Sequence, residues 1–287
     1  MQNKDKTGLS AHSLNIFREC ERCFYLQIKY KISRPRGPIP SIATGIDSLI
    51  KDYFEYFRRK DKLPPFLEGK INGKLITNLK KTYYYDIENY NNYYLWGHLD
   101  EVIELPDGLF IPLDHKTRAS LPSDEPHEAY KFQLGIYSLL LKKENKGQEV
   151  NYGYLIYYYP EKKLIDYEAE EIKNIINFNF EVKKVKLDEG KFNLDEIKET
   201  IIKAIECIET NKIPSSGQNC EFCQWIENTK IYYIESSEER KQEIDLLKDS
   251  NEKKQNSEEE TTLVLPEEGK KKKEKKEEKY PDLFNFS

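Results

Sequence analysis

The sequence predicts a mixed α/β (α+β) fold with an antiparallel hairpin at its centre, and three observations predict it. Segments with a helical period of apolar residues alternate with tyrosine-rich segments that have the composition of strands. Pro106-Asp107-Gly108 separates two alternating segments and is typical of a three-residue hairpin turn. The composition changes near Ser236, which divides a region able to fold from a charged C-terminal part.

The expected elements follow from periodicity and from helix-ending residues. Ser10 is a suitable N-cap for the first helix, and Pro35 ends that helix. The expected helices cover residues 9–30, 42–59, 128–144 and 195–209. The expected strands cover residues 82–88, 93–105, 109–117, 150–159 and 163–169.

The expected domain organisation is one folded domain over residues 1–235, a charged tether over 236–279 and a short apolar peptide over 280–287. The tether contains no aromatic residue and cannot bury enough apolar surface to offset its chain entropy. The chain carries 46 Lys and Arg against 51 Asp and Glu, a net charge of −5. This balance excludes a polycationic nucleic-acid coat, so any contact with nucleic acid has to come from a local patch.

The chain is expected to be cytoplasmic and without a membrane span. No apolar run approaches the length of a membrane helix, and the first ten residues lack the apolar region of a secretory signal. In a cytoplasmic protein, closely spaced cysteines bind metal more often than they form disulfides.

The turn at Gly108 sets the register of the predicted hairpin, because such loops need a left-handed residue at this position. In this register Asp100 lies opposite Asp114, and His98 lies opposite Lys116. The polar face then carries His98, Asp100, Glu104, Asp114 and Lys116. The apolar face carries Leu99, Ile103, Leu105, Leu109, Ile111 and Leu113, which is the pattern of a core face.

Two carboxylates directly opposed on a sheet repel each other, and a divalent cation with oxygen ligands offsets that repulsion. Lys116 adds a positive charge on the same face as Asp100 and Asp114. A cation with a neighbouring lysine suits metal-assisted hydrolysis of a phosphodiester. The alternative interpretation is a solvent-facing strand whose charged residues happen to meet.

Three motifs in order resemble the PD-(D/E)XK nuclease superfamily in its RecB-like branch, which includes helicase–nuclease domains and CRISPR adaptation exonucleases. They are Gly97-x-x-Asp100, Asp114-His115-Lys116-Thr117 and Gln133-x-x-x-Tyr137. The resemblance implies a restriction-endonuclease-like core of three layers, with a mixed central sheet flanked by helices.

By the same resemblance the chain is expected to be a Mg²⁺- or Mn²⁺-dependent deoxyribonuclease. Asp100 and Asp114 would bind the divalent cation, Lys116 would be the catalytic lysine, and Gln133 and Tyr137 would bind DNA. The expected substrates are single-stranded ends or flaps in DNA repair, recombination or defence.

One departure from the family pattern concerns a metal-ligating histidine four residues after a glycine. The equivalent of that histidine is Leu49, four residues after Gly45. Asp47 or Asp52 on the same helix is a candidate substitute. The missing histidine also motivates an alternative function: a weak or inactive nucleic-acid-binding adaptor that keeps the fold and is tethered to a sliding clamp.

Cys20-x-x-Cys23 and Cys220-x-x-Cys223 predict a four-cysteine metal site, since each short gap lets two thiolates reach one ion. The chemistry suits zinc or an iron–sulfur cluster. The resemblance implies a 4Fe-4S cluster that joins the ends of the nuclease domain, with structural Zn²⁺ as the alternative. Relatives usually have one early cysteine and three late ones, so the two pairs depart from the pattern. The alternative for the first pair is buried thiols of an amphipathic helix, and Cys207 is expected in the core.

Pro281-Asp282-Leu283-Phe284 resembles the Asp-Leu-Phe peptides that dock bacterial replication proteins on the sliding clamp. An apolar peptide that ends a flexible tether suits such docking. The sliding clamp is therefore a candidate partner, and an apolar chain end without a partner is the alternative.

Overall fold

The computed structural model describes residues 6–35, 37, 41–160, 178–210, 212–233 and 245–246. The strand predicted at 163–169, the C-terminal peptide 280–287 and all of the tether except 245–246 lie outside the described residues. The chain divides into two compact units, Met1–Gln224 and Trp225–Ser287. Both sheets and all four paired cysteines belong to the first unit.

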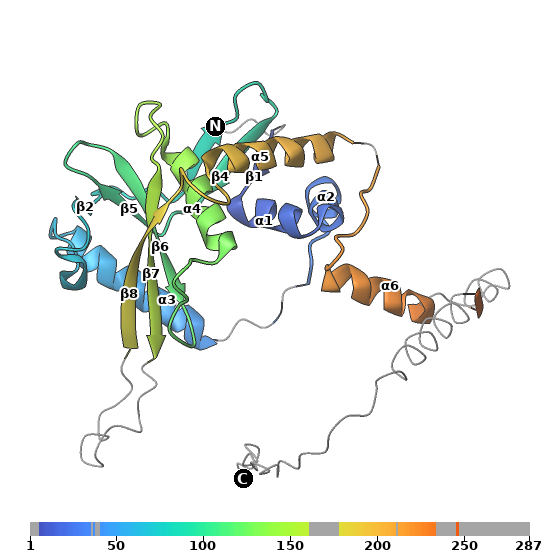
Figure 1. Ribbon diagram of the computed structural model, residues 1–287, viewed down its shortest axis with the longest axis horizontal. Coiled ribbons are helices and arrows are strands. Elements are labelled where there is room, and N and C mark those ends of the chain that lie inside the picture. The colour runs from blue at the N-terminus through green and yellow to red at the C-terminus, as the bar shows by residue number, and fades with distance from the viewer. Residues whose placement is uncertain are drawn as a thin grey trace, which may run out of the picture. The chain divides into compact units, whose positions relative to one another are not determined.

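The central sheet has five strands in the order β2-β5-β6-β7-β8 (Figure 1). These are β2 (Lys74–Leu75), β5 (Glu101–Glu104), β6 (Phe110–Thr117), β7 (Tyr152–Pro160) and β8 (Phe178–Lys186). Strands β6 and β7 are parallel, and the other neighbours are antiparallel. Parallel neighbours need a crossover connection, which helix α4 (Glu128–Leu141) supplies. The sheet is therefore mixed, as predicted.

A second sheet has the order β1-β4-β3, formed by β1 (Thr7–Leu9), β3 (Tyr83–Asp86) and β4 (Tyr93–Gly97). The single strand predicted over 93–105 is therefore wrong. Strand β4 pairs with β1 and β3, whereas β5 pairs with β2 and β6. The chain changes sheets over the three residues between β4 and β5, and Asp100 is the last of them.

The other helices are α1 (Ala11–Glu19), α2 (Glu21–Tyr30), α3 (Ser41–Arg58), α5 (Leu194–Glu209) and α6 (Glu221–Tyr233), with a 3-10 turn η1 (Pro65–Leu67). The single helix predicted over 9–30 is wrong, because Cys20 has an extended backbone (φ −162°, ψ 107°) that separates α1 from α2. The N-cap prediction is confirmed: Ser10 and Ser13 each accept a hydrogen bond from the other's backbone N–H.

Apolar side chains cover both faces of the central sheet. On one face Ile50 and Phe54 of α3 belong to a core cluster with Ile103 and Ile111. On the other face Val102 belongs to a larger cluster that includes residues of α1, α2, α4 and α5. The predicted arrangement of a mixed sheet flanked by helices is thus confirmed. Among the helices in the described ranges, none has the length and apolar character needed to cross a bilayer.

Candidate active site

The predicted hairpin register is confirmed. Glu104 pairs with Phe110, and the backbone N–H of Leu105 donates to the carbonyl of Leu109 at 2.8 Å. Gly108 has the predicted left-handed conformation, with φ of 83°. Continued by one step beyond β5, this register sets Asp100 opposite Asp114.

The expected position of His98 opposite Lys116 is wrong. His98 lies between β4 and β5, where the chain changes sheets, and its ring is exposed. Its Nδ1 contacts the backbone carbonyl of Lys81, and its ring lies edge-on to Trp96. His98 therefore lies outside the paired residues of β5 and β6.

The predicted division of the hairpin into one polar and one apolar face holds in part. Asp114 is 1% exposed, so the alternative of a solvent-facing acidic strand is wrong for this residue. Val102 is buried on the face of Asp114, and Glu101 is buried on the opposite face. Helices cover both sides of the sheet, so apolar residues are needed on both sides.

Asp114 is buried, and its Oδ2 atom lies 2.5 Å from Nζ of Lys116, in an ion pair without a well-directed hydrogen bond. Burial raises the pKa of Asp114 to about 7; the charge of Lys116 opposes this shift, and that of Asp100 adds to it. Asp100 Oδ2 accepts a hydrogen bond of 3.1 Å from the backbone N–H of His115. The carboxyl groups of Asp100 and Asp114 can bind a hard divalent cation, and the buried Oδ2 of Asp114 has no hydrogen bond that would compete.

Lys116 is held by helix α4 as well as by Asp114. Its Nζ donates to Oε1 of Gln133 at 2.9 Å and lies 4.7 Å from the ring centre of Tyr130. The amide of Gln133 in turn donates to the hydroxyl of Tyr137 at 2.7 Å. Gln133 and Tyr137 were expected to contact DNA, but Tyr137 is 7% exposed, and its ring belongs to the core cluster on this face.

Helix α3 brings a further acid toward the site. Leu49, at the position of the missing histidine, is 69% exposed. Asp47 is half-buried and accepts a hydrogen bond of 2.6 Å from Nζ of Lys51. This bond and the charges of Asp47 and Asp100 raise the pKa of Lys51. Asp52 is exposed, whereas Asp47 acts together with Asp100 on the pKa values of both Lys51 and His115.

Sequence reasoning missed a buried ion pair beside the site. Arg58 of α3 pairs with Glu101, and their side chains are 6% and 3% exposed. Arg58 also donates to the carbonyl of Ile76 at 2.6 Å. Because Glu101 directly follows Asp100, this pair fixes the start of β5. The signal was present, since Glu101 is a charged residue on the face that otherwise carries apolar side chains.

The half-buried His115, between Asp114 and Lys116, was also missed. Its ring lies edge-on to Phe54 at 4.6 Å, and its Nδ1 lies 3.2 Å from the hydroxyl of Tyr158. Its Nε2 is buried without a hydrogen-bond partner. Burial lowers the pKa of His115 to about 4.

The four paired cysteines come together in the first unit, and they are buried and free of disulfides. Their sulfur atoms all lie within 4.8 Å of one another. Burial opposes ionisation of Cys20, but hydrogen bonds from the backbone of Gly217 and Cys23 outweigh it and lower the pKa of the thiol to about 7. Cys207 is buried in α5, as predicted, and lies outside this group.

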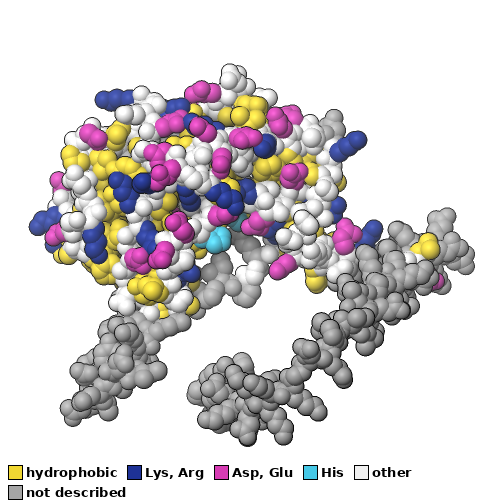
Figure 2. Space-filling view, viewed as in Figure 1, with side chains coloured by type: hydrophobic (Ala, Val, Ile, Leu, Met, Phe, Trp, Pro, Cys, Tyr) yellow, Lys and Arg dark blue, Asp and Glu magenta, His cyan; other side chains and the backbone are white. Residues whose placement is uncertain are grey.

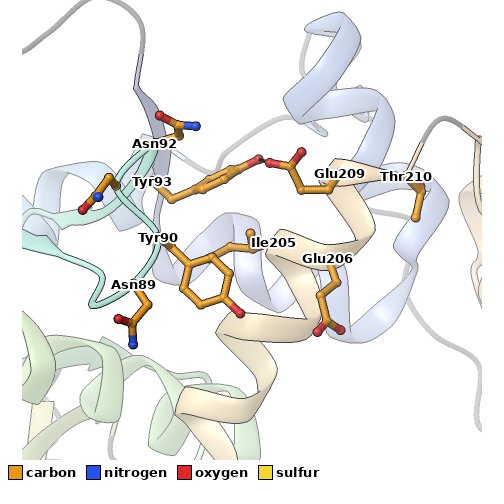
Figure 3. Close-up of a pocket in the computed structure, with 9 residues that line it drawn as sticks. Asn89, Tyr90, Asn92, Tyr93, Ile205, Glu206, Glu209 and Thr210 are labelled. Carbon is orange, nitrogen blue, oxygen red and sulfur yellow. Dashed lines mark hydrogen bonds between the residues drawn. The ribbon is translucent and has the colours of Figure 1, made fainter.

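A separate surface pocket of about 530 Å³ lies between the turn at 89–93 and the C-terminal part of α5 (Figure 3). The hydroxyl of Tyr93 donates to Glu209 across this pocket. No candidate catalytic residue lines it. Figure 2 shows Lys and Arg side chains mixed with Asp and Glu on the visible face of the described residues.

Three comparisons relate this chain to known proteins. A sequence model of the PD-(D/E)XK nuclease superfamily matches residues 46–227. A solved structure named SSO0001 is similar at 15% identity and a TM-score of 0.40, over 75% of this chain and 81% of that chain. A solved structure named "Putative exonuclease", from Eubacterium rectale, is similar at 11% identity and a TM-score of 0.48, over 78% of this chain and 88% of that chain. No curated protein matches the sequence.

Proposed function

This chain belongs to the PD-(D/E)XK nuclease superfamily, and from this premise we propose that it is a hydrolytic nuclease that cleaves DNA in a reaction that depends on Mg²⁺ or Mn²⁺. The main support is the buried carboxyl of Asp114, which lies 2.5 Å from the ammonium group of Lys116 and interacts electrostatically with Asp100. Two acids can bind a metal ion and an adjacent lysine can stabilise negative charge, and metal-assisted phosphodiester hydrolysis needs both functions.

The proposed roles are of two kinds: three acids bind the divalent ion, and one lysine stabilises negative charge. Asp100 and Asp114 hold the divalent ion, and Asp47 takes the place of the missing histidine as a third acid. When bound, the ion lowers the pKa of a water molecule and neutralises charge on the phosphate. Lys116 keeps its ammonium group beside Asp114 through the hydrogen bond to Gln133, and from there it stabilises negative charge that develops during attack.

The proposed substrate is DNA with single-stranded ends or flaps, processed in repair, recombination or defence, within the RecB-like branch of the superfamily. This part of the proposal rests on the motif order of the sequence. Docking of Pro281–Phe284 on a sliding clamp likewise rests on sequence, because this peptide lies outside the described residues.

The experiment compares cleavage of labelled single-stranded DNA, flapped DNA, duplex DNA and RNA in Mg²⁺, Mn²⁺ and EDTA. Asp114→Asn and Lys116→Ala are expected to lose roughly 10²-fold or more in rate, as for other residues that stabilise transition-state charge. Lys203→Ala, an exposed lysine that pairs with Glu199 on α5, is the control and keeps full activity. Equal rates for the wild type and both site variants would reject the assignment.

One observation favours a second candidate, a nucleic-acid-binding adaptor with weak or no turnover. The position of the family's metal-ligating histidine is occupied by an exposed leucine, Leu49. Tight DNA binding without metal-dependent cleavage of any tested substrate would support the adaptor. Cleavage that requires Asp114 and Lys116 would support the nuclease.

A further inference from the structure

We propose that the four cysteines bind a single zinc ion in a closed tetrahedral site, instead of the 4Fe-4S cluster that the resemblance implies. The site joins the break between α1 and α2 and the first turn of α2 to the start of α6, over a sequence separation of about 200 residues. Its role is structural, and it is independent of the nuclease chemistry proposed for Asp114.

The sulfur separations match one tetrahedral ion. Zn–S bonds of about 2.3 Å in a regular tetrahedron set neighbouring sulfurs about 3.8 Å apart. The Sγ atoms of Cys20 and Cys223 are 3.7 Å apart, as are those of Cys23 and Cys220, and those of Cys23 and Cys223 are 3.5 Å apart. Each of the four residues takes part in at least one of these short separations.

An iron–sulfur cluster needs a more open set of ligands. In a 4Fe-4S cluster each cysteine binds a different iron, so the whole inorganic core lies between the thiolates. In a 2Fe-2S cluster the thiolates form two pairs, and sulfurs of different pairs are separated by two metal atoms. Here all four sulfurs lie within 4.8 Å of one another, and Cys23 is close to both Cys220 and Cys223. The enclosed space therefore fits one ion.

The surrounding backbone is built to hold this tight arrangement. The chain is extended at Cys20, between α1 and α2. Gly217 packs against this break so closely that an added Cβ atom would lie 2.2 Å from the carbonyl oxygen of Glu19. That approach lets the N–H of Gly217 donate to Sγ of Cys20 at 3.1 Å.

Charge around the site suits a metal that is bound by four thiolates. Four thiolates and one Zn²⁺ carry a net charge of 4 − 2 = 2 negative units, which calls for positive partners when the site is buried. The guanidinium of Arg34 supplies one, since its Nη2 lies 3.5 Å from Sγ of Cys220. Arg34 is itself oriented by an ion pair of 2.6 Å with Glu19.

The test measures metal, acid-labile sulfide and visible absorption in the full chain, purified anaerobically from cells supplied with both iron and zinc. We expect one zinc per chain, no labile sulfide and no visible absorption. Cys23→Ser and Cys220→Ser should each lose the zinc and lower the melting temperature, because zinc binding contributes to folding. Cys207→Ser, a buried cysteine outside the group, is the matched control and should retain zinc.

A second measurement does not depend on the variants folding. Replacement of zinc by Co²⁺ in the wild-type protein should give the visible spectrum of a tetrahedral cobalt–thiolate site. Asp114→Asn should keep the zinc, which separates this proposal from that of the nuclease site. Iron with labile sulfide, iron without sulfide, or a metal-free protein that melts like the zinc-loaded one would each overturn the proposal.

Discussion

The ammonium group of Lys116 on β6 donates a hydrogen bond of 2.9 Å to the side-chain oxygen of Gln133 on α4. Helix α4 is the crossover between the parallel strands β6 and β7, so this bond ties the lysine to the element that the sheet topology places over it. The amide of Gln133 is fixed in turn by the hydroxyl of Tyr137, whose ring is buried. Two consecutive hydrogen bonds, from Gln133 to Tyr137 and from Lys116 to Gln133, thus hold Lys116 in position.

Gln133→Ala removes this support and leaves Asp114 as the main partner of the lysine. We expect the rate of DNA cleavage to fall about tenfold, equivalent to roughly 1.4 kcal/mol, because the ammonium group is less well positioned. The affinity for DNA should change little, so single-turnover rates and binding are measured separately. Gln148→Ala, on an exposed loop, is the control. A variant that loses affinity and keeps its rate would show that Gln133 contacts DNA instead.

Asp47 provides the second prediction, because it is half-buried and shares the electrostatic neighbourhood of Asp100, whereas Asp52 on the same helix is exposed. Asp47→Asn should raise the Mg²⁺ concentration needed for half-maximal cleavage about tenfold, since one of the three proposed acidic ligands is lost. Asp52→Asn should leave the metal requirement unchanged. The cleavage rate of each variant is measured as a function of Mg²⁺ concentration. Equal shifts for the two variants would show that Asp47 is not a metal ligand.

The third prediction concerns the buried pair of Arg58 and Glu101. Arg58→Met leaves the carboxyl of Glu101 buried without its partner and should cost about 3–5 kcal/mol of unfolding free energy. Adding Glu101→Leu should restore much of this loss, because no unpaired charge then remains. Urea unfolding of both variants and of the exposed control Lys203→Met measures the effect. A double variant no more stable than Arg58→Met would show that packing, not charge, sets the cost.

Several elements could be predicted because their signals are local. Pro106-Asp107-Gly108 defined the hairpin register, since the turn geometry leaves few alternatives. The helices expected over 42–59 and 195–209 are found at 41–58 and 194–209, because apolar periodicity and capping residues are read over a few turns. The spacing of the two cysteine pairs likewise anticipated the four-cysteine group.

The elements that were missed depend on distant partners. The break at Cys20 interrupts a good helical period, and the segment around Gly217, nearly two hundred residues away, packs against it. The change of sheets between β4 and β5 depends on the pairing of β4 with β1. The burial of Asp114 depends on helix α4 covering its face of the sheet. None of these partners is visible in a local window of sequence.

The last prediction uses the half-buried ring of His115, which packs edge-on against Phe54 and has a buried Nε2 atom. Burial lowers the pKa of this histidine to about 4; the charges of Asp100 and Asp47 oppose the shift, and that of Lys116 adds to it. In the unfolded chain the pKa of histidine is about 6.5. Between these values the unfolded state binds a proton that the folded state does not.

This difference sets the sign of the pH dependence. The stability contributed by neutral His115 is fully present above about pH 6.5 and is lost as the pH falls toward 4, by at most about 3 kcal/mol. His115→Phe keeps the ring and removes the titration, so its unfolding free energy should decline less than that of the wild type between pH 7 and pH 4. His12→Phe, on the exposed side of α1, is the control and should follow the wild type. If the unfolding free energies of the wild type and His115→Phe decline in parallel, His115 is protonated as readily in the folded state as in the unfolded state. The protonation of His115 would then not limit stability at low pH.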